Sequence, residues 1–246
     1  MHFADSHLHL SEYADYGPLL RIADLSKIML FSTSVDRSTS LVTLGIARGK
    51  PDPVKAFVGV HPSEAWREPN LDWFEEALRT ATGAGELGLD PNYSEVSPRS
   101  PQMGTFNRQL AAVERIGKPI QIHSRDAEAQ CLEVLSTYQL GSVLMHWFEN
   151  ESLVREVVDR GYFLSFGPAL LFSKKLQRMA TMAAPEQVLA ESDGPVAFKP
   201  LGGVSGPSLI PSVLFKLAQL WKKTFTEAQE LVLENSSNYL GAGGKT

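Results

Sequence analysis

The stretch ADSHLHL, residues 4–10, places two histidines one residue apart within ten residues of the start of the chain. Side chains of a β-strand repeat their direction every two residues, so His7 and His9 lie on one face at the end of a first strand. An isolated pair of this kind also occurs on edge strands that bind nothing. The rest of the chain therefore decides between a structural and a chemical role.

Short β-rich runs alternate with longer amphipathic stretches along the 246 residues. The runs are His2–Ser6, Lys27–Thr33, Lys55–Val60, Gly85–Leu89, Pro119–Ser124, Ser142–Trp147, Tyr162–Phe166 and Gln187–Ser192. Such alternation predicts parallel strands joined by helices, and α/β barrels commonly run to ~250 residues as one domain. We therefore expect a single (β/α)8 TIM-type barrel domain over residues 1–246, with its active site at the C-terminal ends of the strands. A doubly wound open sheet is the alternative, because alternation alone does not show closure.

Local signals place helices and loops between these runs. Apolar residues recur at helical spacing within residues 105–119, and Gly117 is expected to end that helix. The sequence TEAQ, residues 226–229, has the form of a capping box that opens the last helix. Residues 91–104 and 194–208 are expected to be long loops on the strand-to-helix side, where barrel enzymes build their active sites.

The composition is that of an ordinary globular protein, with 43% hydrophobic and 21% charged residues. No stretch approaches the ~20 apolar residues of a membrane span, and the start of the chain does not have the form of a signal peptide. Cys131 is the only cysteine, which fits a reducing compartment, so we expect a cytoplasmic protein. The net charge of −5 excludes a global basic surface, and a nuclease would need a local positive site.

Titratable residues stand at or just past the ends of the predicted strands. They are five of the six histidines and two carboxylates, namely His7, His9, His61, His123, His146, Glu86 and Asp193. A lone histidine of this kind is more often structural, but the C-terminal ends of barrel strands meet at one mouth. Imidazoles and carboxylates gathered there are the donor set of a divalent-metal site.

These residues stand in motifs that resemble the TatD-type metal-dependent hydrolases, within the amidohydrolase-like group of barrel enzymes. The motifs are Asp5-Ser6-His7-Leu8-His9, Gly59-Val60-His61-Pro62, Gly85-Glu86-Leu87-Gly88-Leu89-Asp90, Pro119–Ala127, His146-Trp147-Phe148 and Glu191-Ser192-Asp193-Gly194-Pro195. Their order and spacing extend the resemblance over nearly the whole chain.

The resemblance implies a (β/α)8 barrel that holds one or two divalent ions and hydrolyses DNA. The implied metal ligands are His7, His9, Glu86, His123, His146 and Asp193. Glu86 would bridge the ions, and Asp193 would accept a proton from the attacking water, so these two are the implied catalytic residues. The imidazoles favour zinc or manganese, whereas the family resemblance also implies magnesium.

Two further residues, His61 and Arg125, are expected to contact the substrate, and Trp147 is not counted among the site residues. On the family pattern, His61 lies beside the metals and donates to a phosphate oxygen; its alternative is a structural histidine packed by Pro62. Arg125 is expected to bind phosphate, and its alternative is a salt bridge to Asp126 or another loop carboxylate. Trp147 can stack on a base, although packing at the barrel edge is the more common role of such a tryptophan.

The chain departs from the family pattern at three places. Glu149 and Asn150 stand where the family has a small hydroxyl residue and a glycine, and Val196 replaces a tyrosine. Residues 204–207 read Val-Ser-Gly-Pro where an arginine and an asparagine are common. A carboxylate near the mouth repels phosphate unless it points away, so these changes indicate a narrower or different substrate.

The sequence thus predicts a metal-dependent phosphodiesterase, a DNase with 3'-5' exonuclease action on single strands or ends. The first alternative is an ester or amide hydrolase on the same centre, such as one that cleaves an aminoacyl-tRNA bond. The second is a non-catalytic metal-binding barrel that binds nucleic acid or a protein. We expect DNA as substrate, no membrane contact, no obligate protein partner and a monomeric chain.

Overall fold

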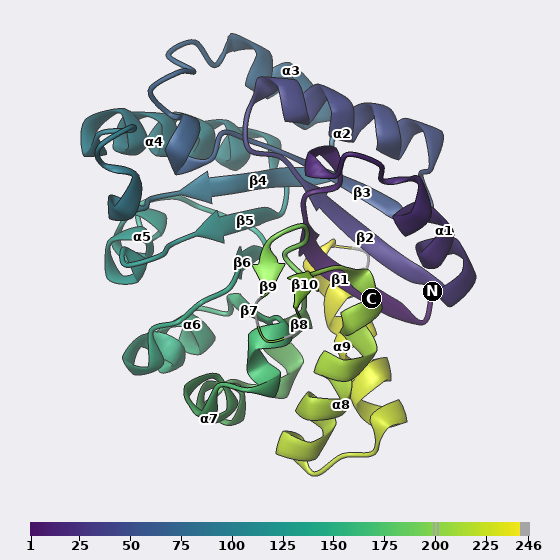
Figure 1. The fold of residues 1–246 in the computed structure, drawn as a ribbon. Coiled ribbons are helices and arrows are strands. Elements are labelled where there is room, and N and C mark those ends of the chain that lie inside the picture. Colours follow the sequence, from purple (N-terminus) through teal and green to yellow (C-terminus); the bar gives the residue numbers. More distant parts are fainter. Residues whose placement is uncertain (199, 201, 242–246) are drawn as a thin grey trace.

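The computed structural model describes residues 1–198, 200 and 202–241, which form a strand barrel wrapped by helices (Figure 1). Eight strands pair in chain order, and each neighbouring pair is parallel. They are β1 Phe3–Leu8, β2 Ile28–Thr33, β3 Val54–Val58, β4 Gly83–Gly88, β5 Ile120–His123, β6 Val143–Met145, β7 Phe163–Phe166 and β8 Val188–Ala190. The predicted (β/α)8 barrel is confirmed. The doubly wound alternative is wrong. In a doubly wound sheet the strand order reverses partway through the sheet, whereas the eight strands here follow chain order throughout.

The seam between the first and last strands is closed at the C-terminal end by backbone hydrogen bonds. The backbone N–H of Asp193 donates to the carbonyl of His7 over 2.9 Å, and the N–H of His9 donates to the carbonyl of Gly194 over 2.7 Å. The segment that follows β8 thereby continues the barrel beside the end of β1. This closure brings Asp193 next to the two histidines of the opening motif.

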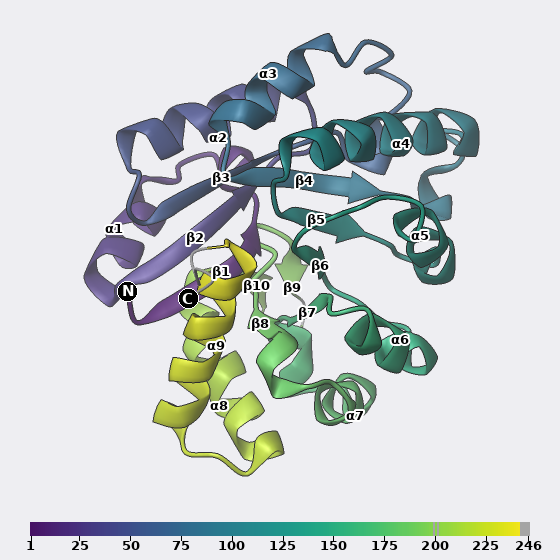
Figure 2. The ribbon, with the colours of Figure 1, turned by 180° about the vertical axis from the view of Figure 1, so that it is seen from behind.

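Helices cover the outside of the barrel in both views (Figures 1 and 2). They are α1 Gly17–Ser26, α2 Arg37–Gly49, α3 Asp72–Thr80, α4 Arg99–Ile116, α5 Glu128–Leu135, α6 Val154–Asp159, α7 Lys174–Met182, α8 Ile210–Trp221 and α9 Phe225–Tyr239. Gly117 ends α4 in the left-handed region, at φ 76°, as predicted. Among the described residues, no helix has the length and apolar character needed to span a membrane.

Two expectations about helix starts are wrong. The capping box of α9 is formed by Thr224 and Glu227, two residues before the predicted position. Thr224 has extended backbone and can cap, whereas Thr226 already lies inside the helix. The expected loop at residues 91–104 holds only in its first half, because α4 begins at Arg99 after Pro98 has fixed the entry into its first turn.

The second expected loop, residues 194–208, contains a small antiparallel hairpin of β9 Ala197–Phe198 and β10 Gly203–Val204. Strands of two residues are too short to show an alternating pattern in the sequence.

The end of the barrel opposite the strand C-termini is filled by aromatic side chains. Tyr239 of α9 is fully buried, and its ring centroid lies 6.1 Å from those of Phe31 and Phe57 and 5.6 Å from that of Phe163. Its hydroxyl donates to the carbonyl of Ile120 over 2.8 Å. Helix α9 thus closes this end of the barrel with apolar side chains. The polar residues named in the sequence analysis lie at the opposite end, where the strands have their C-termini.

Candidate metal centre

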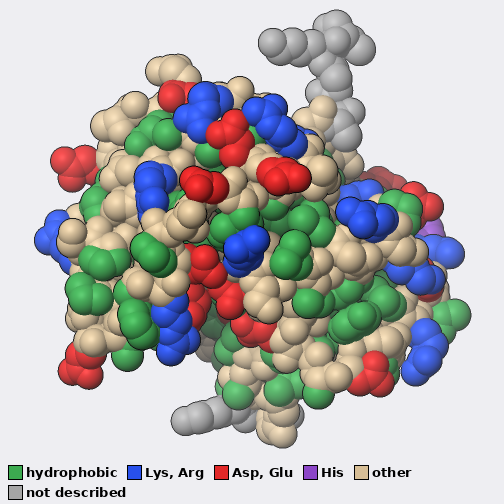
Figure 3. All heavy atoms as spheres, turned by 90° about the horizontal axis from the view of Figure 1, so that it is seen from above, with side chains coloured by type: hydrophobic (Ala, Val, Ile, Leu, Met, Phe, Trp, Pro, Cys, Tyr) green, Lys and Arg blue, Asp and Glu red, His purple; other side chains and the backbone are tan. Residues whose placement is uncertain are grey.

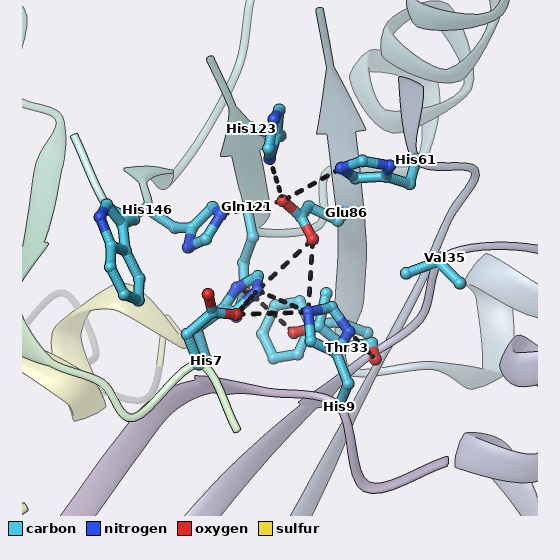
Figure 4. Close-up of polar contacts among 12 residues, drawn as sticks. His7, His9, Thr33, Val35, His61, Glu86, Gln121, His123 and His146 are labelled. Carbon is cyan, nitrogen blue, oxygen red and sulfur yellow. Dashed lines mark hydrogen bonds and ion pairs between the residues drawn. The ribbon is translucent and has the colours of Figure 1, made fainter. Parts of the chain in front are cut away.

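The strand-end residues converge at the C-terminal mouth of the barrel. Figure 4 shows His7, His9, His61, Glu86, His123 and His146 directed toward one another from different elements. The structure also brings Asp193 into this cluster, within 3.6 Å of His7. The mouth opens into a pocket of about 920 Å³. All of the residues predicted to be metal ligands therefore lie in one place.

Two buried hydrogen bonds fix the orientation of the opening histidines. Nδ1 of His7 lies 2.6 Å from Oε1 of Gln121, and Nδ1 of His9 lies 3.1 Å from the carbonyl of Thr33. Both partners are acceptors, so each Nδ1 carries a hydrogen, and in the neutral ring each Nε2 presents a lone pair. These two Nε2 atoms are only 3.2 Å apart.

Carboxylate oxygens approach the same point. Oε2 of Glu86 lies 3.5 Å from Nε2 of His7 and 3.4 Å from Nε2 of His9. Oδ1 of Asp193 lies 3.6 Å and 3.5 Å from the same two nitrogens. Each of the two Nε2 atoms therefore faces two carboxylate oxygens in a buried site, which is unfavourable unless a positive charge lies between them. Two imidazoles and two carboxylates fit a divalent transition ion.

Glu86 also faces a second group of donors. Its Oε1 lies 2.6 Å from Nδ1 of His123 and 2.9 Å from Nε2 of His146. The far nitrogen of His123 contacts Oδ2 of Asp90 at 2.7 Å, and that of His146 contacts Oε2 of Glu191 at 3.4 Å. One carboxylate thus stands between two groups of histidines, which is the position of a bridging ligand.

Among the described residues, three sets of side chains have their ligand atoms within 4.8 Å of one another. The sets are His7, His146 and Asp193; His7, His9 and Glu86; and His61, Glu86 and His123. The sets overlap at His7 and at Glu86.

The electrostatics of the cluster favour a bound cation. Burial opposes the charge of Glu86 and Asp193, but the surrounding histidines outweigh it and hold both pKa values below their usual range. Burial disfavours the charged form of His9, but Asp193 and Glu86 outweigh burial and raise its pKa to about 9, so a proton on Nε2 supplies the positive charge when no metal ion does. Burial also lowers the pKa of His7, which stays neutral. The anionic carboxylates therefore draw positive charge to this point, as a proton or as a metal ion.

His61 differs from the other histidines of the cluster. Its Nδ1 accepts a hydrogen bond from the backbone N–H of Ser63 over 3.1 Å. The hydrogen is therefore on Nε2, which points toward Oε1 of Glu86 at 3.8 Å. Burial lowers the pKa of His61 to about 3, so the ring stays neutral at physiological pH. This tautomer makes His61 a hydrogen-bond donor to the pocket, since its lone pair is already used.

Arg125 lies at the rim of the pocket. Its Nη2 lies 2.9 Å from Oδ2 of Asp90, and its guanidinium sits over the ring of Tyr93 at 5.2 Å. Arg125 therefore forms a salt bridge, as the alternative prediction had it, and its partner is Asp90 and not Asp126. The side chain is 53% exposed and lines the pocket, so it also remains accessible to a substrate.

Sequence reasoning gave no role to Asp90, Gln121 and Glu191, which orient the histidines. The period-two rule of strands offers a signal for two of them. Gln121 precedes His123 by two residues, and Glu191 precedes Asp193 by two, so each shares a face with a residue that was singled out. Buried polar side chains beside metal-ligating residues are usually their orienting partners.

The rim of the pocket is acidic. Its carboxylates outside the cluster are Glu12, Glu64, Asp126, Glu128, Glu149 and Glu151, while Arg125 and Lys175 are the cationic side chains among the described lining residues. The outer surface seen in Figure 3 likewise shows Lys and Arg side chains separated by Asp and Glu. Neither surface resembles the continuous basic groove of a general nucleic-acid binder.

The remaining departures from the family pattern lie beside this mouth. Val196 lines the pocket and is 44% exposed. Ser205 is buried, and its hydroxyl donates to the carbonyl of Ser192 beneath the turn that follows β8. Gly194 is required in this turn, because a Cβ there would lie 2.0 Å from the hydroxyl of Tyr13 and 2.5 Å from the carbonyl of Ser205. In this chain, Ser205 of the segment 204–207, where the family commonly has an arginine and an asparagine, packs against the turn at Gly194.

Comparison with known proteins gives a match over nearly the whole chain. The family model described as TatD related DNase matches residues 4–241. The uncharacterized metal-dependent hydrolase YabD of Bacillus subtilis is 29% identical over 94% of this chain and 96% of its own. The 3'-5' ssDNA/RNA exonuclease TatD of Edwardsiella piscicida is 26% identical over 89% of each chain.

Solved structures share the fold. A TatD family hydrolase from Entamoeba histolytica superposes with a TM-score of 0.84 at 17% identity, covering 96% of this chain and 97% of that one. The TatD homologue YJJV of Escherichia coli gives a TM-score of 0.83 at 21% identity, covering 97% of each. The barrel, the histidine and carboxylate cluster at its mouth and the match of the family model agree, and the chain belongs to the TatD related DNase family.

Proposed function

We propose that this protein is a divalent-metal-dependent 3'-5' exonuclease that hydrolyses phosphodiester bonds of single-stranded DNA. One observation carries the proposal: the Nε2 atoms of His7 and His9 lie 3.2 Å apart in a buried site, and each lies within 3.6 Å of a carboxylate oxygen of Glu86 and of Asp193. The relative from Edwardsiella piscicida, named a 3'-5' ssDNA/RNA exonuclease, supports the substrate class.

The metal-holding residues in this proposal are His7, His9, Glu86, His123, His146 and Asp193. All six belong to one chain, which supports a single domain over residues 1–246 that acts as a monomer. Bound divalent ions supply Lewis acidity toward a phosphoryl oxygen and lower the pKa of water. The imidazole-rich set favours zinc or manganese over magnesium, which prefers oxygen ligands.

The chain's own groups complete the reaction. Asp193 is 9% exposed at the pocket, and its carboxylate is held anionic, so it can accept a proton from the attacking water. Nε2–H of His61 donates to a non-bridging phosphate oxygen as negative charge develops there. The half-exposed guanidinium of Arg125 holds a phosphate at the rim.

The test uses protein stripped with a chelator and supplied again with magnesium, manganese or zinc. The substrate is single-stranded DNA labelled at its 5' end. We expect metal-dependent shortening from the 3' end by the wild type. Glu86→Gln should abolish cleavage, because it removes the charge shared by both groups of histidines. Glu133→Gln, an exposed glutamate on α5 outside the pocket, should cleave like the wild type.

An intact strand with every ion, from protein shown to have taken up metal, would contradict the exonuclease proposal. Ester and amide substrates would then be tested on the same centre, because divalent ions also polarise carbonyl groups.

A further inference from the structure

Trp147 lies on the rim of the metal pocket, directly after His146. It lines the pocket and is only partly buried. Its backbone has φ 39°, a left-handed conformation that is costly for a bulky residue. Such a conformation persists only where the surroundings impose it, and it is common at functional sites. The position and the backbone therefore single out this side chain.

Both ends of Trp147 are held by carboxylates. Its backbone N–H donates to Oε1 of Glu191 over 3.0 Å, and its indole Nε1–H donates to Oε1 of Glu149 over 3.0 Å. The other oxygen of Glu149 lies 3.8 Å from Nζ of Lys175 on α7. The indole ring thus has a fixed orientation at the pocket, and Glu149, a departure from the family pattern, sets it.

The loop that carries this ring is tied to the neighbouring helix. Arg178 of α7 donates to both carboxylate oxygens of Glu151 over 2.9 Å and 2.8 Å. Within the loop, the side chain of Asn150 accepts from the backbone N–H of Ser152 over 3.2 Å. A ring that is already ordered loses little further entropy when a planar ligand stacks on it.

The chemistry of the rim selects which part of a nucleotide meets this ring. Glu149 and the acidic residues around it repel a phosphate, whereas an indole face accepts an uncharged planar base. An unpaired base can leave its stack at little cost, but a base inside a duplex cannot. We propose that Trp147 is a stacking platform for one of the two bases that flank the scissile phosphate, and that Glu149 is its positioning residue. The proposal rests on the proposed function and supplies a reason for a preference for single strands.

The platform is tested with a 5'-labelled oligonucleotide and with two versions that lack either the last or the penultimate base at the 3' end. For the intact strand, Trp147→Ala should raise KM by about 5-fold to 150-fold, the range expected for one base stacked on an aromatic ring. One of the two abasic strands lacks the base that stacks on Trp147. With that strand, Trp147→Ala and the wild type should have equal KM. Trp147→Phe, which keeps an aromatic ring, should fall between them.

Trp66→Ala is the matched control, because Trp66 is 46% exposed and lies outside the pocket lining among the described residues. It should leave KM unchanged. Melting temperature and bound metal are measured for each variant, so that a folding defect is separated from a binding defect. A 2-aminopurine placed in turn at the last and at the penultimate position of the 3' end gives a direct signal, because its fluorescence is quenched when it stacks on the indole.

The positioning role is tested by comparing Glu149→Ala with Glu149→Gln. Both remove the negative charge, but only glutamine keeps an oxygen that accepts from the indole N–H. We expect Glu149→Ala to have a KM about 2-fold to 10-fold above that of Glu149→Gln, with similar kcat. Equal KM for the two variants would overturn the positioning role of Glu149.

The platform is overturned if the wild type degrades the strand and Trp147→Ala has an unchanged KM, or if neither abasic strand removes the difference. The proposed function fails separately, if the metal-loaded wild type leaves the strand intact. In that case the 2-aminopurine signal alone decides: quenching by the wild type and not by Trp147→Ala supports the platform, and equal signals overturn it.

Discussion

At the scale of single residues, the metal centre depends on groups that touch no metal. Gln121 is the clearest example, because its carbonyl oxygen is shared by Nδ1 of His7 at 2.6 Å and the hydroxyl of Thr33 at 2.7 Å. Its amide nitrogen donates to the carbonyl of Ser6 over 2.9 Å. The side chain therefore has a single orientation, and it fixes the tautomer that aims Nε2 of His7 at the cluster.

We expect Gln121→Ala to weaken metal affinity by about 10-fold to 100-fold, because the partner that orients a ligating histidine is lost. Affinity is measured by competition with a chromophoric chelator. Asn235→Ala is the control: Asn235 is also buried and hydrogen-bonded, to the carbonyls of Pro185 and Val188 at 2.7 Å and 2.9 Å, at the start of β8 and away from the cluster. The control should lower the melting temperature and keep the affinity. Equal loss of affinity in both variants would show that Gln121 acts only through stability.

The types and places of the clustered residues could be predicted from the sequence, but their pairings could not. His7 and His9 follow from strand alternation alone. That Asp90 binds both His123 and Arg125 depends on how two loops approach each other, which no local pattern records. Whether such pairs form is decided by tertiary packing.

At the scale of elements, all eight barrel strands were predicted within a few residues, because buried parallel strands are short apolar runs. The start of α9 was misplaced by two residues. The cap was predicted at Thr226, but Thr224, two residues earlier, is a residue of the same type and can also cap a helix. Only Thr224 has a glutamate three residues later, Glu227, so that each side chain accepts from the other's backbone N–H.

Because Thr224 is the N-cap of α9, we expect Thr224→Ala to lower the free energy of unfolding by about 0.5–2 kcal/mol, the usual effect of losing an N-cap. Thr226→Ala, an exposed residue of the first turn, should change stability little. Thermal melting of the two variants beside the wild type measures the difference. An equal shift for both would mean that the cap adds nothing to a helix already anchored by buried Tyr239.

At the scale of the whole molecule, the barrel has two unlike ends. One end is filled by the aromatic cluster around Tyr239, which supplies packing. The other gathers histidines and carboxylates whose lone pairs oppose one another, so this end is destabilising until a cation is present. Packing at the hydrophobic end therefore stabilises a fold in which the metal-binding side chains are already close together before a cation binds.

It follows that metal binding should stabilise the whole fold. A ligand that binds only the folded state at 100 times its Kd adds about 2.7 kcal/mol. For a protein of this size that is a rise of roughly 5–10 °C in melting temperature, which chelation should reverse. Glu86→Gln should lose most of this increment. Tyr138→Phe, which removes a hydroxyl bonded to Asn107 at 2.9 Å, should melt lower and keep the increment, because distant sites contribute additively. Identical melting of stripped and metal-supplied protein would contradict a cation site at the mouth.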